Sequence, residues 1–248
     1  MVGSKENPAD WLAGFQKNGF AILSDALPSR MVSELIDAIE RAPTGVSSLR
    51  QRGQDVYAMR NLIESVPAVQ TLADSAPMRA LVKLILGSGA FAVRGLLFDK
   101  TPEANWKVPW HQDLTIAVRH RVDVSGFGPW SIKAGVQHVQ PPVTVLEQML
   151  TVRLHLDDCP EENGPLQVLP GSHTNGRLTA ADIRALRAST PAVSCAMACA
   201  GVILMRPLLL HASSPSQRPG HRRVIHLEFA ANPLPGGLVW LAEHDQPV

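Results

Sequence analysis

Apolar residues in the first ninety positions recur mostly at helical spacing. Between residues 31 and 39 they fall three or four positions apart, and Ser29 is placed to cap the helix that they predict. A second helix is predicted over 77–86, because its apolar positions have the same spacing and Gly87 is suited to end it. We therefore expect a helix-rich N-terminal part over 1–88.

Beyond residue 89 the pattern changes to short apolar runs separated by Gly, Pro and Asn, which is typical of strands. One helix is predicted among them, over 179–187, with Thr179 as its cap. Helices followed by many short strands indicate an α+β fold and favour a sandwich or jelly roll. We expect a single domain over 1–248, with its strand-rich core at 89–231. The predicted strands cover 19–23, 91–98, 111–118, 147–156, 165–169, 201–210 and 222–230.

In the segment 119–143 the apolar residues follow neither a helical nor a strand-like spacing, and the segment contains several glycines and prolines. Loops of this length in a compact domain are usually lids, binding loops or disordered segments. We predict that 119–143 is a lid loop over a ligand site. Its candidate substrate contacts are Trp130, Lys133 and His138.

Composition and charge narrow the choice of partner. The chain has 23 Lys and Arg against 22 Asp and Glu, a net charge of +1, so it offers no broad electrostatic surface to nucleic acid or anionic lipid. No apolar run approaches the ~18 residues of a membrane span, and the N-terminus lacks the order of a signal peptide. With three cysteines, an odd number, a disulfide framework is not expected. We expect a cytoplasmic protein that binds a small molecule, and leave its oligomeric state open.

The histidines suggest a metal site. A non-haem Fe(II) centre uses two imidazoles and one carboxylate, and a His-x-Asp motif on a strand supplies two of these ligands on one side. His111 and Asp113 form such a motif at the start of a predicted strand, and His211 ends another strand about a hundred residues later. The alternative is a surface His-Asp pair and an unrelated core histidine.

Two further His-x-acid motifs compete with this one, and chance predicts roughly 0.8 motifs in such a chain. In the first, His155 ends a predicted strand and Asp157 is more simply interpreted as a turn residue. In the second, His226 and Glu228 lie near the end of the chain, with only His244 after them as a third ligand. We therefore expect neither of these pairs to bind metal.

Four sequence blocks together resemble the phytanoyl-CoA dioxygenase family. They are Trp-His-Gln-Asp at 110–113, the Asn-Gly-Pro-Leu-Gln-Val-Leu-Pro-Gly-Ser-His run at 163–173, His-Ala-Ser at 211–213, and Arg222. The resemblance extends over about 19–230. It implies a double-stranded β-helix, a cupin-like jelly roll with the N-terminal helices packed on one sheet. It also implies Fe(II), 2-oxoglutarate and O2 as cofactors and cosubstrates.

The same resemblance implies roles for single residues. It assigns the metal to His111, Asp113 and His211, and an acid at 113 indicates an oxygenase, since halogenating relatives have Gly or Ala there. It assigns the distal carboxylate of 2-oxoglutarate to Arg222, eleven residues after His211, although Arg223 follows it on the opposite face of the predicted strand. Further cosubstrate contacts implied are Ser213, Gln112, Leu96 and Arg153, where Leu96 could instead be a core residue and Arg153 could instead contact the substrate. Alternation would turn Gln112 away from the metal ligands. Lys100 matches a lysine of the family.

We predict a dioxygenase that hydroxylates an unactivated C–H bond of a small metabolite and releases succinate and CO2. The same cofactors also serve desaturation, cyclisation and epimerisation. Two other classes remain as alternatives. A non-catalytic cupin-like module that binds metal or sugar would not need Arg222 in the metal cavity. A zinc hydrolase would need a general base beside a metal-bound water.

Overall fold

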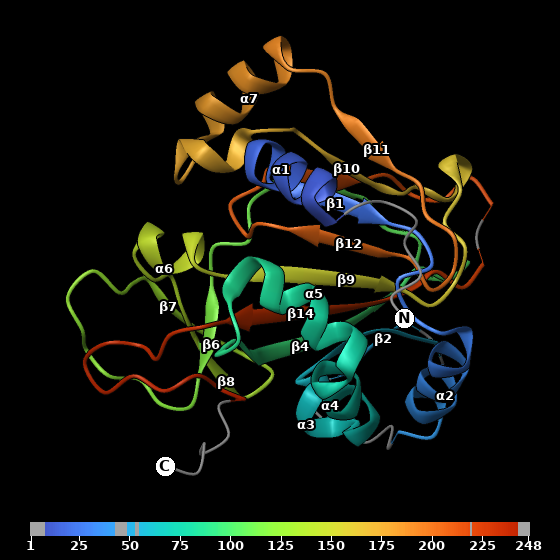
Figure 1. Ribbon diagram of the computed structural model, residues 1–248, viewed down its shortest axis with the longest axis horizontal. Helices are drawn as coiled ribbons and strands as arrows, with labels where there is room; N and C mark the ends of the chain where they lie inside the picture. The colour runs from blue at the N-terminus through green and yellow to red at the C-terminus, as the bar shows by residue number, and fades with distance from the viewer. Residues whose placement is uncertain (1–7, 43–48, 53–54, 219, 243–248) are drawn as a thin grey trace.

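The computed structural model describes residues 8–42, 49–52, 55–218 and 220–242 (Figure 1). Its strands pair antiparallel in three sheets. The seven-stranded sheet consists, in spatial order, of β1 (Phe20–Leu23), β12 (Val202–Met205), β9 (Leu150–His155), β14 (Arg223–Ala230), β4 (Phe91–Asp99), β3 (Asp55–Arg60) and β2 (Leu49–Arg52). The four-stranded sheet consists of β11 (Val193–Cys195), β10 (Leu166–Val168), β13 (His211–Ser213) and β5 (Val108–His111). The third sheet consists of β6 (Ile116–Val118), β8 (Val136–Val139) and β7 (Trp130–Lys133).

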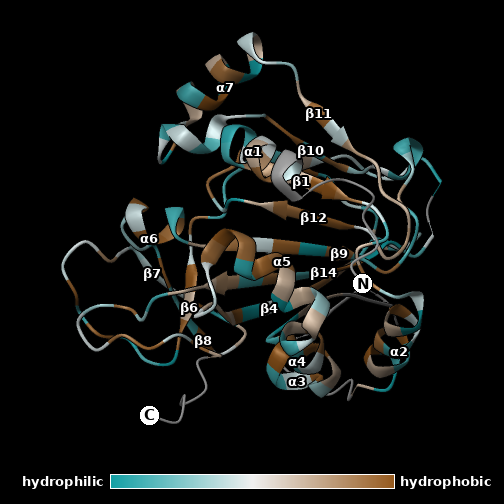
Figure 2. Cartoon of the chain, viewed as in Figure 1, coloured by the Kyte–Doolittle hydropathy of each residue, from teal (hydrophilic) through white to brown (hydrophobic). Residues whose placement is uncertain are grey.

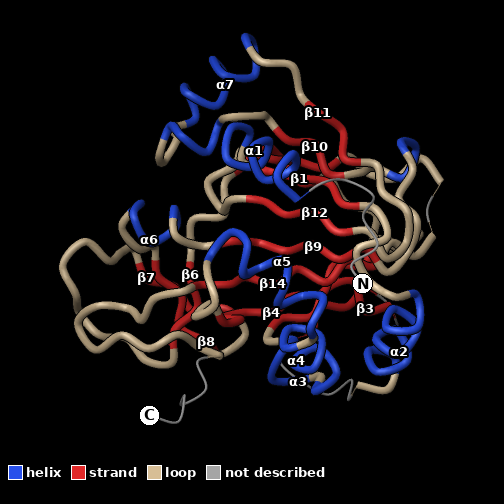
Figure 3. Tube along the Cα trace, viewed as in Figure 1, coloured by secondary structure: helices blue, strands red, loops and turns tan. Residues whose placement is uncertain are grey.

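The N-terminal helices pack on the seven-stranded sheet, as Figure 3 shows. They are α1 (Pro8–Asn18), α2 (Ser29–Glu40), α3 (Leu62–Ser65), α4 (Pro67–Asp74) and α5 (Ala76–Leu86). Helices α3 and α4 contact β4, α5 contacts β9, and α1 contacts β1. The remaining helical segments are α6 (Val143–Glu147), η1 (Glu161–Asn163), η2 (Ser172–Asn175) and α7 (Ala180–Ser189). The predicted mixture of helices and antiparallel strands is therefore confirmed.

Alternate residues of β14 separate the hydrophobic core from a polar wall. Ile225, Leu227 and Phe229 are fully buried in the same cluster as side chains of α2, α4 and α5. Burial of such a side chain stabilises the fold by about 1.5–3 kcal/mol. Figure 2 shows the hydrophobic stretches of this region in brown. The opposite face of the same strand presents His226 and Glu228 to a cavity.

The sequence predicted the start of α7 and the end of α5 correctly, but it predicted the wrong cap for α2. The side chain of Thr179 caps α7 and forms a reciprocal pair with Asp182, and α5 ends at Gly87, where φ is 86°. Ser29, however, is the first residue of α2, not its cap. The N-cap is Pro28, whose extended backbone makes no side-chain capping bond. None of the described helices is both long enough and apolar enough to cross a bilayer.

Two predicted strands around the metal ligands are wrong in extent. The strand predicted over 111–118 is divided, because β5 ends at His111 and β6 begins only at Ile116. The strand predicted over 201–210 ends at Met205, after which a turn leads into β13 with His211 as its first residue. As a result, His111 is the last residue of β5, His211 is the first residue of β13, and Asp113 lies in the irregular segment between β5 and β6.

The segment 119–143 is not one long loop. It contains β7 and β8, which form a hairpin that pairs with β6. The hairpin turn is made by Ala134 and Gly135, both with positive φ (51° and 77°), as the tight turn between antiparallel strands requires. Alanine is an unusual residue in that position, so the hairpin was missed in the sequence.

Candidate active site

Strands β5 and β13 bring the two predicted histidine ligands together. His111 and His211 are direct partners across these strands, and their ring centroids are 4.2 Å apart. Asp113 lies in the irregular segment after β5, where its backbone N–H donates to the Pro207 carbonyl at 2.9 Å. The Nε2 atoms of His111 and His211 lie 3.8 and 3.7 Å from the Asp113 carboxylate. One ligand atom of each residue lies within 4.8 Å of the others.

The chemistry of this donor set fits a divalent metal ion. Each histidine has its Nδ1 atom 2.8 Å from a carbonyl oxygen, that of Pro109 for His111 and that of Leu209 for His211. With Nδ1–H donating to the carbonyl, the Nε2 lone pair is directed at the centre, which is the usual arrangement of metal-bound histidine. Oδ2 of Asp113 is buried and makes no hydrogen bond. A buried charged oxygen without a partner is costly, and a cation would supply that partner.

The protonation states agree with this interpretation. Burial alone would raise the pKa of Asp113, but the attraction of the neighbouring histidines, His211 first, and of Arg153 outweighs it and lowers the pKa to about 2. Burial lowers the pKa of His211 to about 4. At neutral pH the site therefore presents a carboxylate and a neutral imidazole, which are the forms that bind metal.

The three residues line a cavity of about 320 Å³ that has walls from both large sheets. Of the other predicted site residues, Leu96, Arg153, Ser213, Arg222 and Lys133 line it as well. Gln112, Trp130 and His138 do not.

One end of this cavity is strongly cationic. Arg153 and Arg222 line it, and Lys100 lies behind Ser213, donating to Oγ at 3.1 Å and to the Ser214 carbonyl. Burial, and then Arg222, lowers the pKa of Arg153 to about 10 and that of Lys100 to about 7. None of the three has a carboxylate at ion-pair distance among the described residues, and the Nε atoms of both arginines are buried without a hydrogen bond. Such an end is suited to an anionic ligand.

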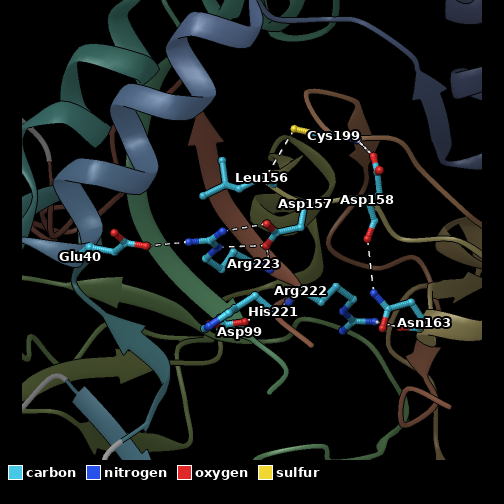
Figure 4. Close-up of polar contacts among 10 residues, drawn as sticks. All are labelled: Glu40, Asp99, Leu156, Asp157, Asp158, Asn163, Cys199, His221, Arg222 and Arg223. Carbon is cyan, nitrogen blue, oxygen red and sulfur yellow. Dashed lines mark hydrogen bonds and ion pairs between the residues drawn. The ribbon is translucent and has the colours of Figure 1, made fainter. Parts of the chain in front are cut away.

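Adjacent arginines at the start of β14 point to opposite sides of the sheet (Figure 4). Arg222 points to the cavity, where its guanidinium donates to the carbonyls of Asn163 and Gly164. Arg223 forms a two-point ion pair with Asp157, at 2.8 and 3.0 Å, and contacts Glu40 at 3.1 Å. Arg222 and Arg223 therefore point to opposite faces of the sheet, as predicted. The structure also shows that Asp157, the acid of the motif that begins at His155, is a partner of Arg223.

Gln112 requires a correction. Its amide nitrogen donates to the carbonyls of Gly176 and Leu208, at 2.8 and 2.7 Å, and its oxygen accepts from the Leu178 backbone N–H at 2.8 Å. Its side chain therefore holds the segments around 176–178 and Leu208 together and does not line the cavity. Because β5 ends at His111, strand alternation does not explain this orientation, and the structure gives no support to the expected cosubstrate contact.

The candidate substrate contacts differ among themselves. Lys133 lines the cavity and donates to the Thr115 hydroxyl at 3.2 Å. Trp130 packs on a hydrophobic cluster with Arg121 over its ring, and His138 is buried with Nδ1 3.1 Å from the Val136 carbonyl. Trp130 and His138 therefore belong to the small sheet, since neither reaches the cavity.

Several polar residues of the cavity wall were not predicted from the sequence. Among them are Arg94 on β4 and His226 and Glu228 on β14, all nearly buried. A signal was present, because His226 and Glu228 alternate with buried apolar residues on a strand. We considered this pair only as a metal-binding motif.

Comparison with known proteins identifies the family. A sequence model of the family described as phytanoyl-CoA dioxygenase (PhyH) matches residues 15–224. The chain belongs to this family. As a member it is an iron- and 2-oxoglutarate-dependent enzyme, so the predicted family, enzyme class and cofactors are confirmed. A search of curated proteins gives no significant match.

Solved structures share the fold at low sequence identity. AviO1 from Streptomyces viridochromogenes Tue57 has a TM-score of 0.66 at 22% identity, with 93% of this chain and 97% of AviO1 covered. EctD from S. alaskensis with bound Fe has a TM-score of 0.70 at 19% identity, over 93% of this chain and 80% of EctD. SnoK, a non-heme alpha ketoglutarate dependent carbocyclase from nogalamycin biosynthesis, has a TM-score of 0.67 at 14% identity, over 91% and 84%.

Proposed function

We propose that this enzyme hydroxylates an unactivated C–H bond of a small polar metabolite and converts 2-oxoglutarate to succinate and CO2. The observation that carries the proposal is the shared cavity, in which the His111, Asp113 and His211 set faces the buried guanidinium of Arg222. A metal ligand set and a separate cationic end are the two parts that a chelating keto acid requires.

We interpret the seven-stranded and four-stranded sheets as the two halves of a double-stranded β-helix. Two observations support this interpretation. The cavity has walls from β4, β9 and β14 of one sheet and from β5 and β13 of the other. The structures that share the fold also match nearly the whole chain. One domain over 1–248 belongs to the same proposal.

His111, Asp113 and His211 would hold the iron, because their free nitrogen and oxygen atoms converge. Bound iron and 2-oxoglutarate supply the oxidant, since oxidative decarboxylation of the keto acid by O2 leaves one oxygen atom for the substrate. The protein contributes by orientation. The backbone carbonyls of Pro109 and Leu209 fix the two imidazoles, and burial keeps His211 neutral.

The cationic end would bind the distal carboxylate of 2-oxoglutarate. Arg222 offers a planar pair of donors that matches a carboxylate. Arg153 and Ser213 border the same space, and Lys100 supports Ser213 from behind. Leu96 forms an apolar part of the wall that excludes water. Lys133, with Thr115, lines the cavity from a different sheet and is the proposed substrate contact that remains.

Cyclisation is the second candidate reaction. SnoK, which shares the fold, is described as a carbocyclase, and desaturation or epimerisation would use the same cofactors. A non-catalytic metal-binding module has less support, because Arg222 lies in the cavity. A zinc hydrolase also has less support. The lining carboxylates are Asp113, one of the proposed metal ligands, and Glu228, which is paired with Arg94 at 3.0 Å, so neither is free to act as a base.

The cellular setting is part of the proposal. A small-molecule partner fits a cavity of this size, and a net charge of +1 does not favour nucleic acid or a membrane surface. The described cysteines Cys159, Cys195 and Cys199 are all free, which supports a cytoplasmic location.

The test is iron-dependent release of succinate. Protein loaded with Fe(II) under anaerobic conditions is exposed to air with 2-oxoglutarate, for wild type, His111→Ala and the control His120→Ala, which changes an exposed histidine outside the cavity. We expect succinate from wild type and the control but not from His111→Ala. With a substrate found by metabolite screening, a product that gains one oxygen indicates hydroxylation, and one that loses two hydrogens indicates cyclisation or desaturation. Equal succinate from all three proteins would contradict the proposal.

A further inference from the structure

Four polar side chains cross the cavity wall on three neighbouring strands. Arg153 of β9 lies opposite His226 of β14, and Glu228 of β14 lies opposite Arg94 of β4. Because His226 and Glu228 are two positions apart, they share a face, and all four side chains line the cavity. We call these four residues the polar ladder.

The contacts within the polar ladder determine the tautomer of His226. Nη1 of Arg153 lies 2.9 Å from Nδ1 of His226. A guanidinium only donates hydrogen bonds, so Nδ1 must accept and the ring proton must be on Nε2. Nε2 lies 3.5 Å from Oε1 of Glu228 and makes no hydrogen bond, but the carboxylate attracts a proton at that position. Glu228 is itself held by Arg94 at 3.0 Å.

Arg153 depends on this imidazole for its position. Its guanidinium lies 5.8 Å from the ring centre of Phe98, and its Nε is buried without a hydrogen bond. Among the described residues, the bond to His226 is its one side-chain hydrogen bond, and no carboxylate lies at ion-pair distance. A long side chain that is held by a single hydrogen bond can adopt several rotamers in an open cavity once that bond is lost. Without the bond to His226, the guanidinium of Arg153 would therefore no longer be held in one position.

We propose that His226 is a positioning residue, which aims Arg153 at a carboxylate of the cosubstrate through its Nδ1 acceptor. Glu228 and Arg94 complete the ladder by keeping the imidazole proton on the opposite nitrogen. The inference rests on the proposed function, because it takes 2-oxoglutarate as the anion that Arg153 meets. It extends that function to a residue outside the metal set and the distal-carboxylate contact.

Two variants separate the two ring nitrogens. His226→Asn keeps an acceptor near the position of Nδ1, whereas His226→Gln keeps a polar atom near the position of Nε2 and loses the acceptor for Arg153. Both remove the ring from its edge-on contact with Phe98, so they are matched in lost packing. A purely structural role of His226 would affect the two variants alike.

The first measurement is equilibrium binding, not turnover. Calorimetry with Mn(II)-loaded protein under anaerobic conditions gives the dissociation constant of 2-oxoglutarate for wild type and both variants. We expect His226→Asn to bind within about twofold of wild type and His226→Gln to bind about tenfold more weakly or worse, as loss of a hydrogen bond to a charged group implies. Equal constants for the two variants, or the reverse order, would overturn the proposal.

The second measurement needs neither a variant nor a metal. Nitrogen NMR of metal-free wild-type protein with labelled histidine reports which ring nitrogen carries the proton, and the contact of the His226 ring with the Phe98 ring assigns the signal. We expect a neutral ring protonated at Nε2, and a ring protonated at Nδ1 would overturn the proposal even if both variants failed to fold.

The two measurements also distinguish this inference from the proposed function. If Mn(II)-loaded wild type bound no 2-oxoglutarate while the tautomer was as expected, the proposed function would fail and this inference with it. If wild type bound 2-oxoglutarate and the two variants did not differ, the positioning role alone would be rejected.

Discussion

The two faces of the seven-stranded sheet use the same strands for opposite purposes. On the helix-covered face, β14 contributes Ile225, Leu227 and Phe229 to a dry hydrophobic core. On the cavity face, the positions between them contribute His226 and Glu228, whose polar atoms are buried and only partly satisfied. Along β14, therefore, one set of alternate residues stabilises the core, and the set between them lines the cavity.

The two faces also differ in how their polar groups are balanced. On the helix-covered face, Arg223 has two carboxylates, those of Asp157 and Glu40. On the cavity face, Arg222 and Arg153 have none at contact distance among the described residues. A buried charge without a partner lowers the stability of a fold. The two arginines therefore reduce the stability of the free protein, and a bound anionic ligand can offset this loss.

The largest expected effect is on the cavity side. Asp113→Ala removes the one carboxylate of the metal set, so iron-dependent succinate release should fall to background, because two histidines alone leave the set incomplete. Since Asp113 contributes no hydrogen bond from its buried Oδ2, the free energy of unfolding of the metal-free protein should change by less than about 1 kcal/mol. Asp123→Ala, in an exposed loop, is the control. Retained iron-dependent activity in Asp113→Ala would contradict the assignment.

A pair of leucines compares the two faces directly. Leu227→Ala on the helix-covered face should lower the free energy of unfolding by about 2–5 kcal/mol, because it leaves a void in a closed core. Leu96→Ala borders the existing cavity, so it should cost less stability but raise the KM for 2-oxoglutarate. Urea denaturation and succinate assays on both variants measure the two effects. The division of roles would be wrong if the two leucines exchanged these effects.

Arg222 and Arg223 compare the two faces of the sheet at neighbouring positions, and the effects expected from changing them are smaller. Arg222→Gln should raise the KM for 2-oxoglutarate by about tenfold or more, as expected when a charged hydrogen-bonding partner is lost. Arg223→Gln should leave that KM unchanged and lower the free energy of unfolding by about 1 kcal/mol, because its ion pairs are partly exposed. Steady-state kinetics measure the KM for 2-oxoglutarate of each variant, and thermal unfolding measures its stability. A larger KM effect in Arg223→Gln would reverse the assignment.

The smallest effect is a pH dependence. Burial, followed by the neighbouring cations Arg222 and Arg153, lowers the pKa of Lys100 to about 7, while burial raises the pKa of the nearby Cys159 thiol and keeps it neutral. Free protein therefore loses the Lys100 proton as the pH rises through about 7, whereas a bound dicarboxylate favours the charged form. Affinity for 2-oxoglutarate should weaken above pH 7 by up to about tenfold per pH unit.

Binding of 2-oxoglutarate to Mn(II)-loaded protein from pH 6 to 9 measures this dependence. Lys100→Met should bind more weakly at pH 6 and show a flatter profile, because it has no proton to lose. Lys83→Met, which changes an exposed lysine on α5, should reproduce the wild-type profile. A Lys100→Met profile as steep as that of wild type would assign the dependence to another group.

Features encoded within a few residues could be predicted from the sequence. The apolar spacing of α2 and α5 and the cap at Thr179 are local, and all three helices form. The hairpin of β7 and β8 could not be predicted, because its strands are four residues long and its turn contains Ala134 with a positive φ. Periodicity cannot be measured over so few positions.

The metal ligand set was predicted for a partly wrong reason. We expected His111 and Asp113 to share one strand, but the strand ends at His111 and a backbone bond to Pro207 positions Asp113. Which strands meet depends on pairing between residues a hundred positions apart, which spacing alone does not encode. The resemblance to a family suggested the residues, and the structure brings one candidate ligand atom of each within 4.8 Å of the others.

Helix α7 illustrates how this fold can diversify. Although its own residues are capped and regular, none of them is buried, and Arg187 lies over the ring of Trp110, next to the half-exposed His111. Replacing or lengthening such an appendage would subtract almost nothing from the core while reshaping the approach to the metal ligands. Changes on α7 could therefore alter the approach to the cavity without disturbing the core beneath it.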